Sequence, residues 1–234
     1  MLDVVAVVSL GPGDPELITL KGLNTLNRAD YIFCPATMLS GGVMISRSKD
    51  ILSALNIDDT KIITFSVPMS ENRIQSIENY NKVAGEVEEK YRAGYKVAVV
   101  AEGDAGFYSS SYYISEILET KNIPVDRIAG VPAFIACAAS HNICISKQKE
   151  EVDIVTHLSS KEDLQSKISK GRTVILMKAS QFEEIIKETL ALTPEDITYH
   201  YFENSGLSGK EFYTNRKADI CNRHFPYFSL LIIQ

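Results

Sequence analysis

The stretch from Val4 to Leu26 constrains the fold more than any other part of the sequence. Its first part, Val4–Leu10, is apolar and largely β-branched, which is typical of a strand buried on both faces of a parallel sheet. The turn Gly11-Pro12-Gly13 follows this strand at once. Ligands of open α/β sheets bind at the carboxyl ends of strands, so the turn is a candidate binding loop.

A helix is predicted to begin directly after this turn. Asp14 is suited to the N-cap, and Pro15 is suited to the first helical position, where its missing N–H has no cost. Leu17, Leu20 and Leu23 would form the apolar stripe of the helix. The loop matches neither G-x-G-x-x-G nor G-x-x-x-x-G-K-[ST], which argues against a Rossmann dinucleotide site and a nucleotide-triphosphate loop.

Two more predicted strands end in glycine-containing loops. Val97–Ala101 leads into the loop Glu102–Ser109. Val125–Ile128 leads into Gly130-Val131-Pro132 and then into a helix rich in small residues, Ala133–His141. The sequence therefore predicts several loops at the carboxyl ends of strands in one parallel sheet.

The rest of the chain continues to alternate between strand and helix patterns. Further strands are predicted at Tyr31–Cys34, Ile62–Phe65, Val152–Leu158, Thr173–Lys178, Ile197–Glu203 and Phe228–Ile233. Further helices are predicted at Ser48–Leu55, Glu71–Ala93 and Gln181–Leu190, and one that Ser109 or Ser110 caps and that runs to about Thr120. Lys147–Glu151 is a charge-dense break without glycine between two such alternations. We therefore predict an α/β fold with two domains, residues 1–147 and residues 148–234.

Charge and cysteine usage limit the classes of partner. The 234 residues carry a formal charge of -6 at pH 7, which argues against nucleic acid as a partner. The four cysteines contain no C-x-x-C pair and no zinc spacing, so no metal site is expected. No signal-peptide pattern and no apolar run of the ~18 residues needed for a membrane span are present. These features predict a soluble cytoplasmic protein with reduced thiols and no membrane partner.

The loops carry a resemblance to a known family. The twelve residues Gly11–Gly22 resemble the N-terminal signature of the tetrapyrrole (corrin/porphyrin) methylases, which use S-adenosylmethionine as methyl donor. Gly103-Asp104-Ala105 resembles the family's loop that touches the donor, and Leu176-Met177-Lys178 resembles its methionine segment. Ala129–Ala133 takes the place of the family's P-G-[VI]-[ST]-[SA] segment, although Pro132 replaces the hydroxyl residue.

The resemblance implies a fold, a donor site and an assembly. We expect two α/β domains of the methylase type with a cleft between them, the second domain completing the S-adenosylmethionine site, and a homodimer. The residues implied in donor binding are Gly103, Asp104, Ala105, Tyr108, Val131, Pro132, Ala133 and Met177. Pro12, Gly13 and Asp14 are implied on the substrate side.

The substrate of such an enzyme is a tetrapyrrole that bears many carboxylates. Arginine forks suit carboxylates, and Arg47, Lys49 and Arg73 follow predicted strand ends, so these residues are candidates for substrate binding as well as ordinary surface charges. His141 is a conceivable proton acceptor, but its position favours a cap at the end of a helix. The sequence identifies no general base.

One branch of the family is the most similar. Phe65–Arg73 and Ala101–Ser109 resemble the corresponding segments of the precorrin-2 C(20)-methyltransferases, with Ser66-Val67 as an insertion. The resemblance implies methylation of precorrin-2 or cobalt-factor II at carbon 20 during cobalamin biosynthesis. Two alternatives stay open: a methyltransferase of the same fold acting on another ring carbon, RNA or protein, and a module that binds without turnover.

Overall fold

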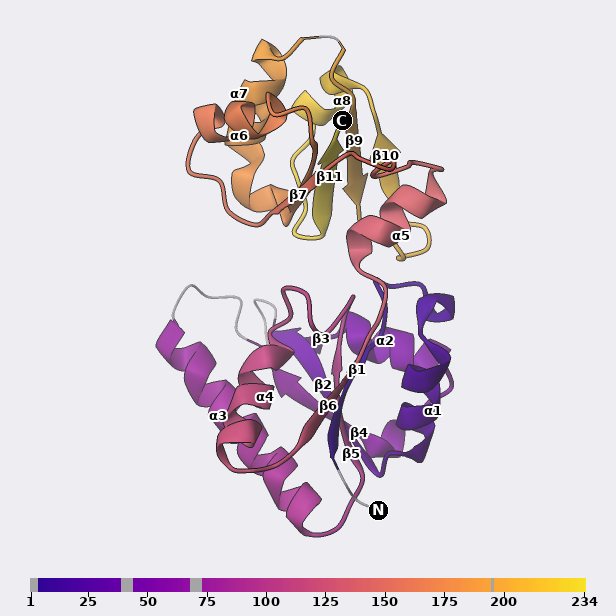
Figure 1. Ribbon diagram of the computed structural model, residues 1–234. Coiled ribbons are helices and arrows are strands. Elements are labelled where there is room, and N and C mark those ends of the chain that lie inside the picture. The colour runs from indigo at the N-terminus through magenta and orange to yellow at the C-terminus, as the bar shows by residue number, and fades with distance from the viewer. Residues whose placement is uncertain (1–3, 39–43, 68–72, 195) are drawn as a thin grey trace. The chain divides into compact units, whose positions relative to one another are not determined.

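A computed structural model describes residues 4–38, 44–67, 73–194 and 196–234, although not the side chains of residues 38 and 73–76. The chain divides into two compact units, Met1–Pro132 and Ala133–Gln234. Each unit has its own β-sheet, and Figure 1 shows the helices that accompany each sheet. The division falls earlier than the 147/148 boundary predicted from the sequence, since the helix Ala133–Ser140 is grouped with the second unit.

The first unit is built on a mainly parallel sheet. Its strands are β1 (Val5–Ser9), β2 (Tyr31–Met38), β3 (Met44–Ile45), β4 (Ile62–Ser66), β5 (Val97–Ala101) and β6 (Val125–Ile128). β1 pairs in parallel with β5 and β6, and β2 pairs in parallel with β4 and β5. The short strand β3 is antiparallel to β2. Every residue of β1 and β5 is buried, as the apolar runs predict for strands inside a parallel sheet.

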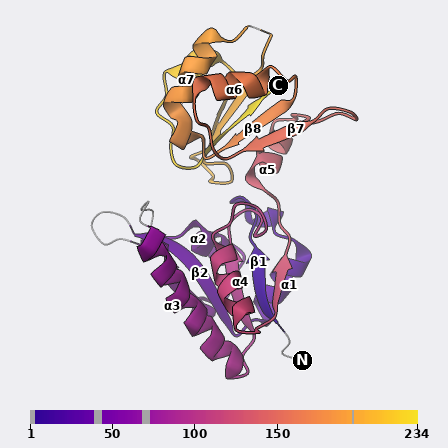
Figure 2. The ribbon, with the colours of Figure 1, turned by 60° about the vertical axis from the view of Figure 1, so that its left-hand side comes forward.

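Helices cover both faces of this sheet, as Figures 1 and 2 show. They are α1 (Leu20–Arg28), α2 (Arg47–Ala54), α3 (Arg73–Arg92) and α4 (Ser111–Thr120). Val5 and Val7 of β1 point to a core that α3 and α4 complete, whereas Ala6 and Val8 point to a second core with α1 and α2. This alternation gives a three-layer α/β unit.

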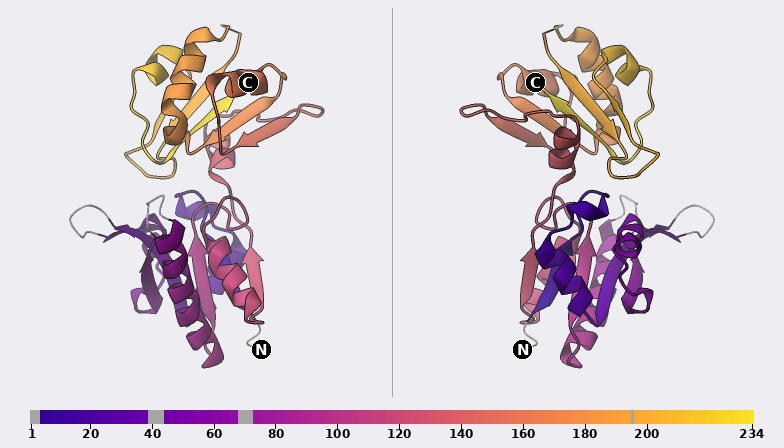
Figure 3. Two further views of the ribbon diagram at one scale, coloured as in Figure 1. Left: turned by 90° about the vertical axis from the view of Figure 1, so that its left-hand side faces the viewer. Right: turned by 90° about the vertical axis from the view of Figure 1, so that its right-hand side faces the viewer.

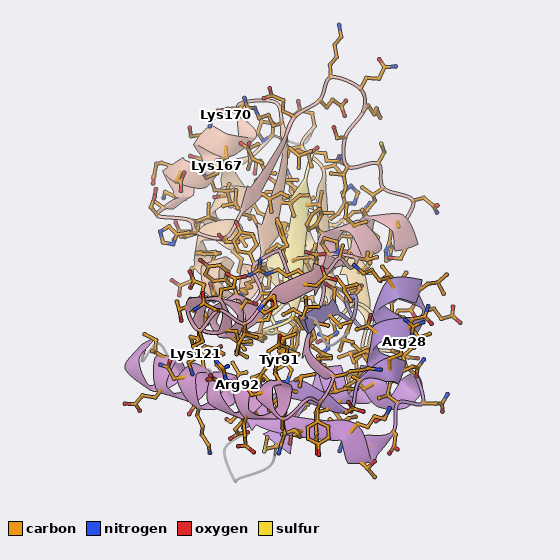
Figure 4. The ribbon with its side chains drawn as sticks, turned by 60° about the horizontal axis from the view of Figure 1, so that its bottom comes forward. Arg28, Tyr91, Arg92, Lys121, Lys167 and Lys170 are labelled. Carbon is orange, nitrogen blue, oxygen red and sulfur yellow. The ribbon has the colours of Figure 1, made fainter. Side chains whose placement is uncertain are left out.

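The carboxyl ends of α3 and α4 are tied by one carboxylate. Glu88 accepts hydrogen bonds from Arg92 over 2.8 Å and from Lys121 over 2.6 Å. Figure 4 labels Arg92 and Lys121 on the two neighbouring helix ends. Because both basic residues share a carboxylate, this part of the surface is a local ion-pair network.

The second unit contains a mixed sheet. Its strands are β7 (Val152–Val155), β8 (Thr173–Met177), β9 (Tyr199–Glu203), β10 (Phe212–Thr214) and β11 (Ser229–Ile233), and its helices are α5 (Ala133–Ser140), α6 (Lys161–Ile168), α7 (Glu183–Leu192) and α8 (Lys217–Cys221). The strand order is β10-β9-β11-β8-β7; β7 and β8 are parallel, and the other described pairs of this sheet are antiparallel. One face packs against α6, α7 and α8 around Leu176, Tyr201 and Leu231, and Figure 3 shows these layers from two sides.

The helix predicted directly after Gly13 is interrupted. Asp14 caps a single 3-10 turn, Pro15–Leu17, and its side chain accepts from the Glu16 N–H. The α-helix begins only at Leu20, where Thr19 is the N-cap and accepts from the Gly22 N–H. The predicted leucine stripe was therefore wrong at Leu20, which is 79% exposed, whereas Leu23 packs against the core beside the buried Gly22 and Leu26.

Candidate active site

The first two glycine loops are joined directly. The Gly11 N–H donates to the Gly103 carbonyl over 3.1 Å, and the Gly103 N–H donates to the Gly11 carbonyl over 2.7 Å. Both residues have positive φ, 79° and 66°, which glycine adopts without the strain that other residues incur. The turn after β1 and the loop after β5 therefore form one continuous backbone surface at the carboxyl edge of the sheet.

Ser9 links the same loops to the end of β6. Its buried hydroxyl donates to the Ile128 carbonyl over 2.6 Å and accepts from the Ala105 N–H over 2.8 Å. Sequence reasoning gave Ser9 no role, since it lies inside an otherwise apolar strand. A hydroxyl in a fully buried run is the signal that could have identified it, because such a group needs hydrogen-bond partners.

Asp104 holds two loops with one carboxylate. Its Oδ1 accepts from the Gly106 N–H over 2.8 Å, within its own loop. Its Oδ2 accepts from the Gly130 N–H over 2.7 Å, in the loop after β6. Asp104 thus makes the backbone contacts expected of a turn cap, while each oxygen keeps a lone pair for a further donor.

Gly130 is required by close packing. A Cβ atom at this position would lie 2.4 Å from the Cβ of Ser9 and 2.7 Å from the carbonyl oxygen of Gly103. No side chain can be accommodated there without movement of the backbone. Ser9, Asp104 and Gly130 together fix the ends of β1, β5 and β6.

Arg47 lies behind the first loop rather than on the surface. It is 8% exposed, and its Nη2 donates to the Pro12 carbonyl over 3.2 Å. Its Nε lies 3.8 Å from Oε2 of Glu102, the residue that precedes Gly103. Burial lowers the pKa of Arg47 and raises the pKa of Glu102, and in each case the attraction between the two charges opposes the shift.

The other predicted residues of the first unit lie in different surroundings. Lys49 is on α2, and its Nζ is 3.1 Å from Oδ2 of Asp59 in a surface ion pair. Tyr108 is exposed, has a positive φ of 51° and packs edge-on against Phe107. Val131 and Pro132 are half-buried beside Gly130. Arg73 begins α3, and its side chain lies outside the described residues.

Two predicted donor-binding residues belong to the second unit. Ala133 is the first residue of α5 and is half-buried. Met177 is the last residue of β8 and lies opposite Leu230 of β11. Lys178 follows with a positive φ of 55°, so the chain turns sharply directly after Met177. Their approach to the loops of the first unit stays a prediction.

His141 directly follows the last residue of α5, which agrees with the prediction that it caps the end of a helix. Its Nδ1 is 3.3 Å from the Cys137 carbonyl oxygen and 2.9 Å from the Ser140 hydroxyl. Its ring packs against Tyr213, with centroids 4.0 Å apart. These contacts give His141 a structural role within the second unit.

The joined loops offer backbone donors, backbone carbonyls and one carboxylate. Within the described ranges, no three His, Cys, Asp or Glu side chains lie close enough together to hold a metal ion. Nor does any helix in the described part of the chain have the length and apolar character to cross a bilayer. The loop surface suits a polar organic molecule with hydroxyl and amino groups that can donate to Asp104.

Comparison with known proteins gives a consistent assignment. The sequence profile of the Tetrapyrrole (Corrin/Porphyrin) Methylases matches residues 4–220. The cobalt-precorrin-2 C(20)-methyltransferase of Salmonella typhimurium is 23% identical over 229 residues, which cover 97% of this chain and 94% of that protein. The uroporphyrinogen-III C-methyltransferase of Methanocaldococcus jannaschii is 30% identical over 199 residues, which cover 81% and 76%.

The fold is that of a solved enzyme of cobalamin biosynthesis. The structure of a cobalt precorrin-4 methyltransferase is similar over 98% of this chain and 93% of that one, with a TM-score of 0.73 and 18% sequence identity. Because both units are covered, the prediction of an α/β fold of this type is confirmed.

Proposed function

The chain belongs to the tetrapyrrole (corrin/porphyrin) methylases, and on this premise we propose that it methylates carbon 20 of a precorrin-2-type ring with S-adenosylmethionine as donor. The coarser activity, methyl transfer to a tetrapyrrole in cobalamin biosynthesis, follows from the family and from the names of the relatives. The position on the ring is supported by the Salmonella typhimurium relative, which matches almost the entire chain.

The observation that carries the proposal is the union of three loops at one sheet edge. Gly11 and Gly103 exchange hydrogen bonds, and Asp104 binds the Gly130 N–H. We propose that Gly103, Asp104 and Ala105, with Tyr108, Val131 and Pro132, line the donor site. Pro12, Gly13 and Asp14 lie in the neighbouring turn and are proposed to face the tetrapyrrole.

The reaction needs positioning more than it needs acid–base groups. S-adenosylmethionine supplies an electrophilic methyl group on a sulfonium when it is bound. The contribution of the chain is to hold the ring carbon in line with that methyl group and to exclude water. Positioning of this kind can lower the barrier by ~7–11 kcal/mol. Loops fixed by Ser9, Asp104 and close glycine packing are suited to this task.

Basic side chains near the loops are proposed to bind the ring carboxylates. Lys49 is paired with Asp59, but this pair is on the surface, where exchange for a substrate carboxylate costs about 1 kcal/mol or less. Arg73 is the first residue of α3, and an arginine can bind a carboxylate in a bidentate manner. Arg47 is buried and already donates to the Pro12 carbonyl, so it is not among the residues proposed to bind a ring carboxylate.

The second unit is proposed to complete the donor site through Ala133 and Met177, and the chain is proposed to be a homodimer. Light scattering at micromolar concentration should give twice the mass of the 26.0 kDa chain. A mass of one chain would contradict the dimer without affecting the proposed reaction.

The reaction is tested on purified protein. Incubation with S-adenosylmethionine and precorrin-2 or cobalt-factor II should yield a product one methylene heavier, with the new methyl located at carbon 20 by NMR. Asp104→Ala should weaken binding of S-adenosylhomocysteine in calorimetry, whereas the surface change Asp126→Asn should not. Binding of S-adenosylhomocysteine without any methylated product would identify a module without turnover.

The 30% identity to a uroporphyrinogen-III C-methyltransferase favours one second candidate, a methylase of another ring carbon. A methyl group found at a different carbon in the same NMR experiment would establish that candidate and exclude the carbon 20 assignment.

A further inference from the structure

One guanidinium contacts both loops of the candidate site from behind. Arg47 donates from Nη2 to the Pro12 carbonyl, 3.2 Å away, in the turn after β1. Its Nε is 3.8 Å from Oε2 of Glu102, at the beginning of the loop after β5. Gly103, the next residue, exchanges two hydrogen bonds with Gly11. Arg47 therefore contacts the same two loops that the hydrogen bonds between Gly11 and Gly103 join.

We propose that Arg47 and Glu102 are a positioning pair, which holds the Gly11–Gly13 turn against the Glu102–Ser109 loop in the geometry that methyl transfer requires. The inference rests on the proposed function. It assigns Arg47 to the support of the two loops instead of to a substrate carboxylate, and it gives Glu102 a role that the sequence did not indicate.

The ion pair between Arg47 and Glu102 is not explained by a contribution to the stability of the fold. Burial disfavours the charge of both partners, since the pKa of Arg47 is lowered and that of Glu102 is raised in spite of their attraction. Asp50 on α2 and Cys34 on β2 also face this pair, and the charge of Asp50 further disfavours the charge on Glu102. Arg47 is 8% exposed and Glu102 is 32% exposed, so the pair is partly buried, and an ion pair that loses hydration on folding adds little net stability. A costly pair that contacts two binding loops therefore points to function.

Direct binding of substrate by Arg47 makes a different prediction. A guanidinium that binds a ring carboxylate mainly affects KM for the tetrapyrrole when it is removed. A guanidinium that holds the loops affects kcat, because the reacting atoms lose their alignment. The two roles are thus separated by steady-state kinetics.

The experiment compares Arg47→Met, Glu102→Gln and the double variant with the wild-type protein. The surface pair Arg127–Glu119, with side chains 38% and 49% exposed, gives the matched controls Arg127→Met and Glu119→Gln. Arg47→Met removes the guanidinium that faces the half-buried Glu102 carboxylate, and Glu102→Gln removes the carboxylate that faces the buried Arg47 charge, so both single variants are expected to be destabilised. The double variant removes both charges, so its Tm should lie within about 4 °C of the wild-type value or above it.

Three measurements on the double variant decide the question. We expect kcat to fall by about ten- to a hundredfold, KM for the tetrapyrrole to change less than about threefold, and the Kd of S-adenosylhomocysteine to change less than about threefold. The affinity should persist because Asp104 keeps its contacts to Gly106 and Gly130. A wild-type kcat in the double variant, or a loss confined to KM, would overturn the proposal.

Failure of the proposed function is recognised separately. If the wild-type protein methylates no precorrin-2-type ring, hydrogen exchange at the Gly11 and Gly103 amides tests the pair without any substrate. Both amides are hydrogen-bonded across the two loops. If these amides exchange at least about tenfold faster in the double variant than in the wild type, the proposal that Arg47 and Glu102 hold the two loops together is supported. Unchanged exchange overturns it.

Discussion

At the scale of single residues, the Ser9 hydroxyl connects the ends of three strands. Ser9→Ala removes a donor to Ile128 and an acceptor for Ala105, both of which are buried. Leaving these backbone groups unsatisfied should lower the free energy of unfolding by about 1–3 kcal/mol. Urea denaturation measures the change. The control Ser169→Ala, at an exposed helix end, should alter it by less than about 0.5 kcal/mol.

Two glycines with opposite surroundings provide a paired prediction. Gly130→Ala places a methyl group 2.4 Å from the Ser9 Cβ and should destabilise the protein by about 1–3 kcal/mol. Gly85→Ala, inside α3 with nothing within 4 Å, should stabilise it by about 0.5–1 kcal/mol. Thermal unfolding of both variants should therefore move in opposite directions. Equal shifts would show that the tight contact at Gly130 is absent in solution.

The sequence predicted the glycine loops but not what supports them. Gly11 and Gly103 were found because glycine after a buried strand has a recognised meaning. Ser9 and Glu102 were missed because their partners, Ile128, Ala105 and Arg47, are distant in the sequence. Arg47 was predicted to bind a substrate carboxylate or to be a surface charge, and its burial could not be predicted because it depends on the contact between α2 and the Pro12 carbonyl.

At the scale of elements, the antiparallel pair β9 and β10 carries a pH-dependent contact. His200 lies with its Nδ1 2.9 Å from the Tyr213 hydroxyl oxygen. Burial and the nearby His141 lower the pKa of His200 below its ordinary value of 6.5. The folded state therefore binds the proton less tightly than the unfolded state, so stability should fall as the pH decreases through 6.5.

Denaturation at a series of pH values checks this prediction. Between about pH 7.5 and 5.5, His200→Asn should lose less stability than the wild type, because Asn cannot be protonated in this range. His157→Asn, at an exposed position, is the control and should keep the wild-type slope. An unchanged slope in His200→Asn would contradict the assignment.

Elements with strong patterns were predicted well, and elements defined by tertiary contacts were not. The apolar runs at β1 and β5 identified buried parallel strands. The first helix was predicted to begin at Pro15, but it begins at Leu20. Asp14 and Pro15 suit the start of a 3-10 turn as well as the start of an α-helix, and the N-cap of the α-helix is Thr19. β10 was missed because Phe212–Thr214 is short and becomes a strand only through its pairing with β9.

At the scale of the whole molecule, ligand binding should raise stability by linkage. A molecule that binds only the folded state stabilises it by about 2.7 kcal/mol at a hundredfold excess over its Kd. We expect this increase with S-adenosylhomocysteine in calorimetry of the intact chain. Adenosine at the same concentration is the control and should act more weakly. Equal stabilisation by both would show that the amino-acid part of the molecule makes no contact.

The sequence predicted two parts, but the boundary that it indicated differs from the division between the two compact units. The charged break at Lys147–Glu151 marked a change of pattern, whereas the contacts divide the chain after Pro132. The helix Ala133–Ser140 could belong to either part, because a pattern of small residues does not reveal which sheet it packs on. The cleft expected between the domains stays a prediction, as do the sites that depend on it.

The central place of β1 has a consequence for biosynthesis. This strand lies between β5 and β6, and Ser9 bonds to residues 96 and 119 positions further along the chain. During translation β1, which is rich in β-branched residues, therefore leaves the ribosome long before its partner strands β5 and β6 have both been synthesised. Until Ile128 leaves the exit tunnel, the nascent chain exposes that segment to aggregation and to chaperones that bind apolar strands. The loops of the candidate site can form only after this delay, so translation speed through this region influences the yield of folded protein.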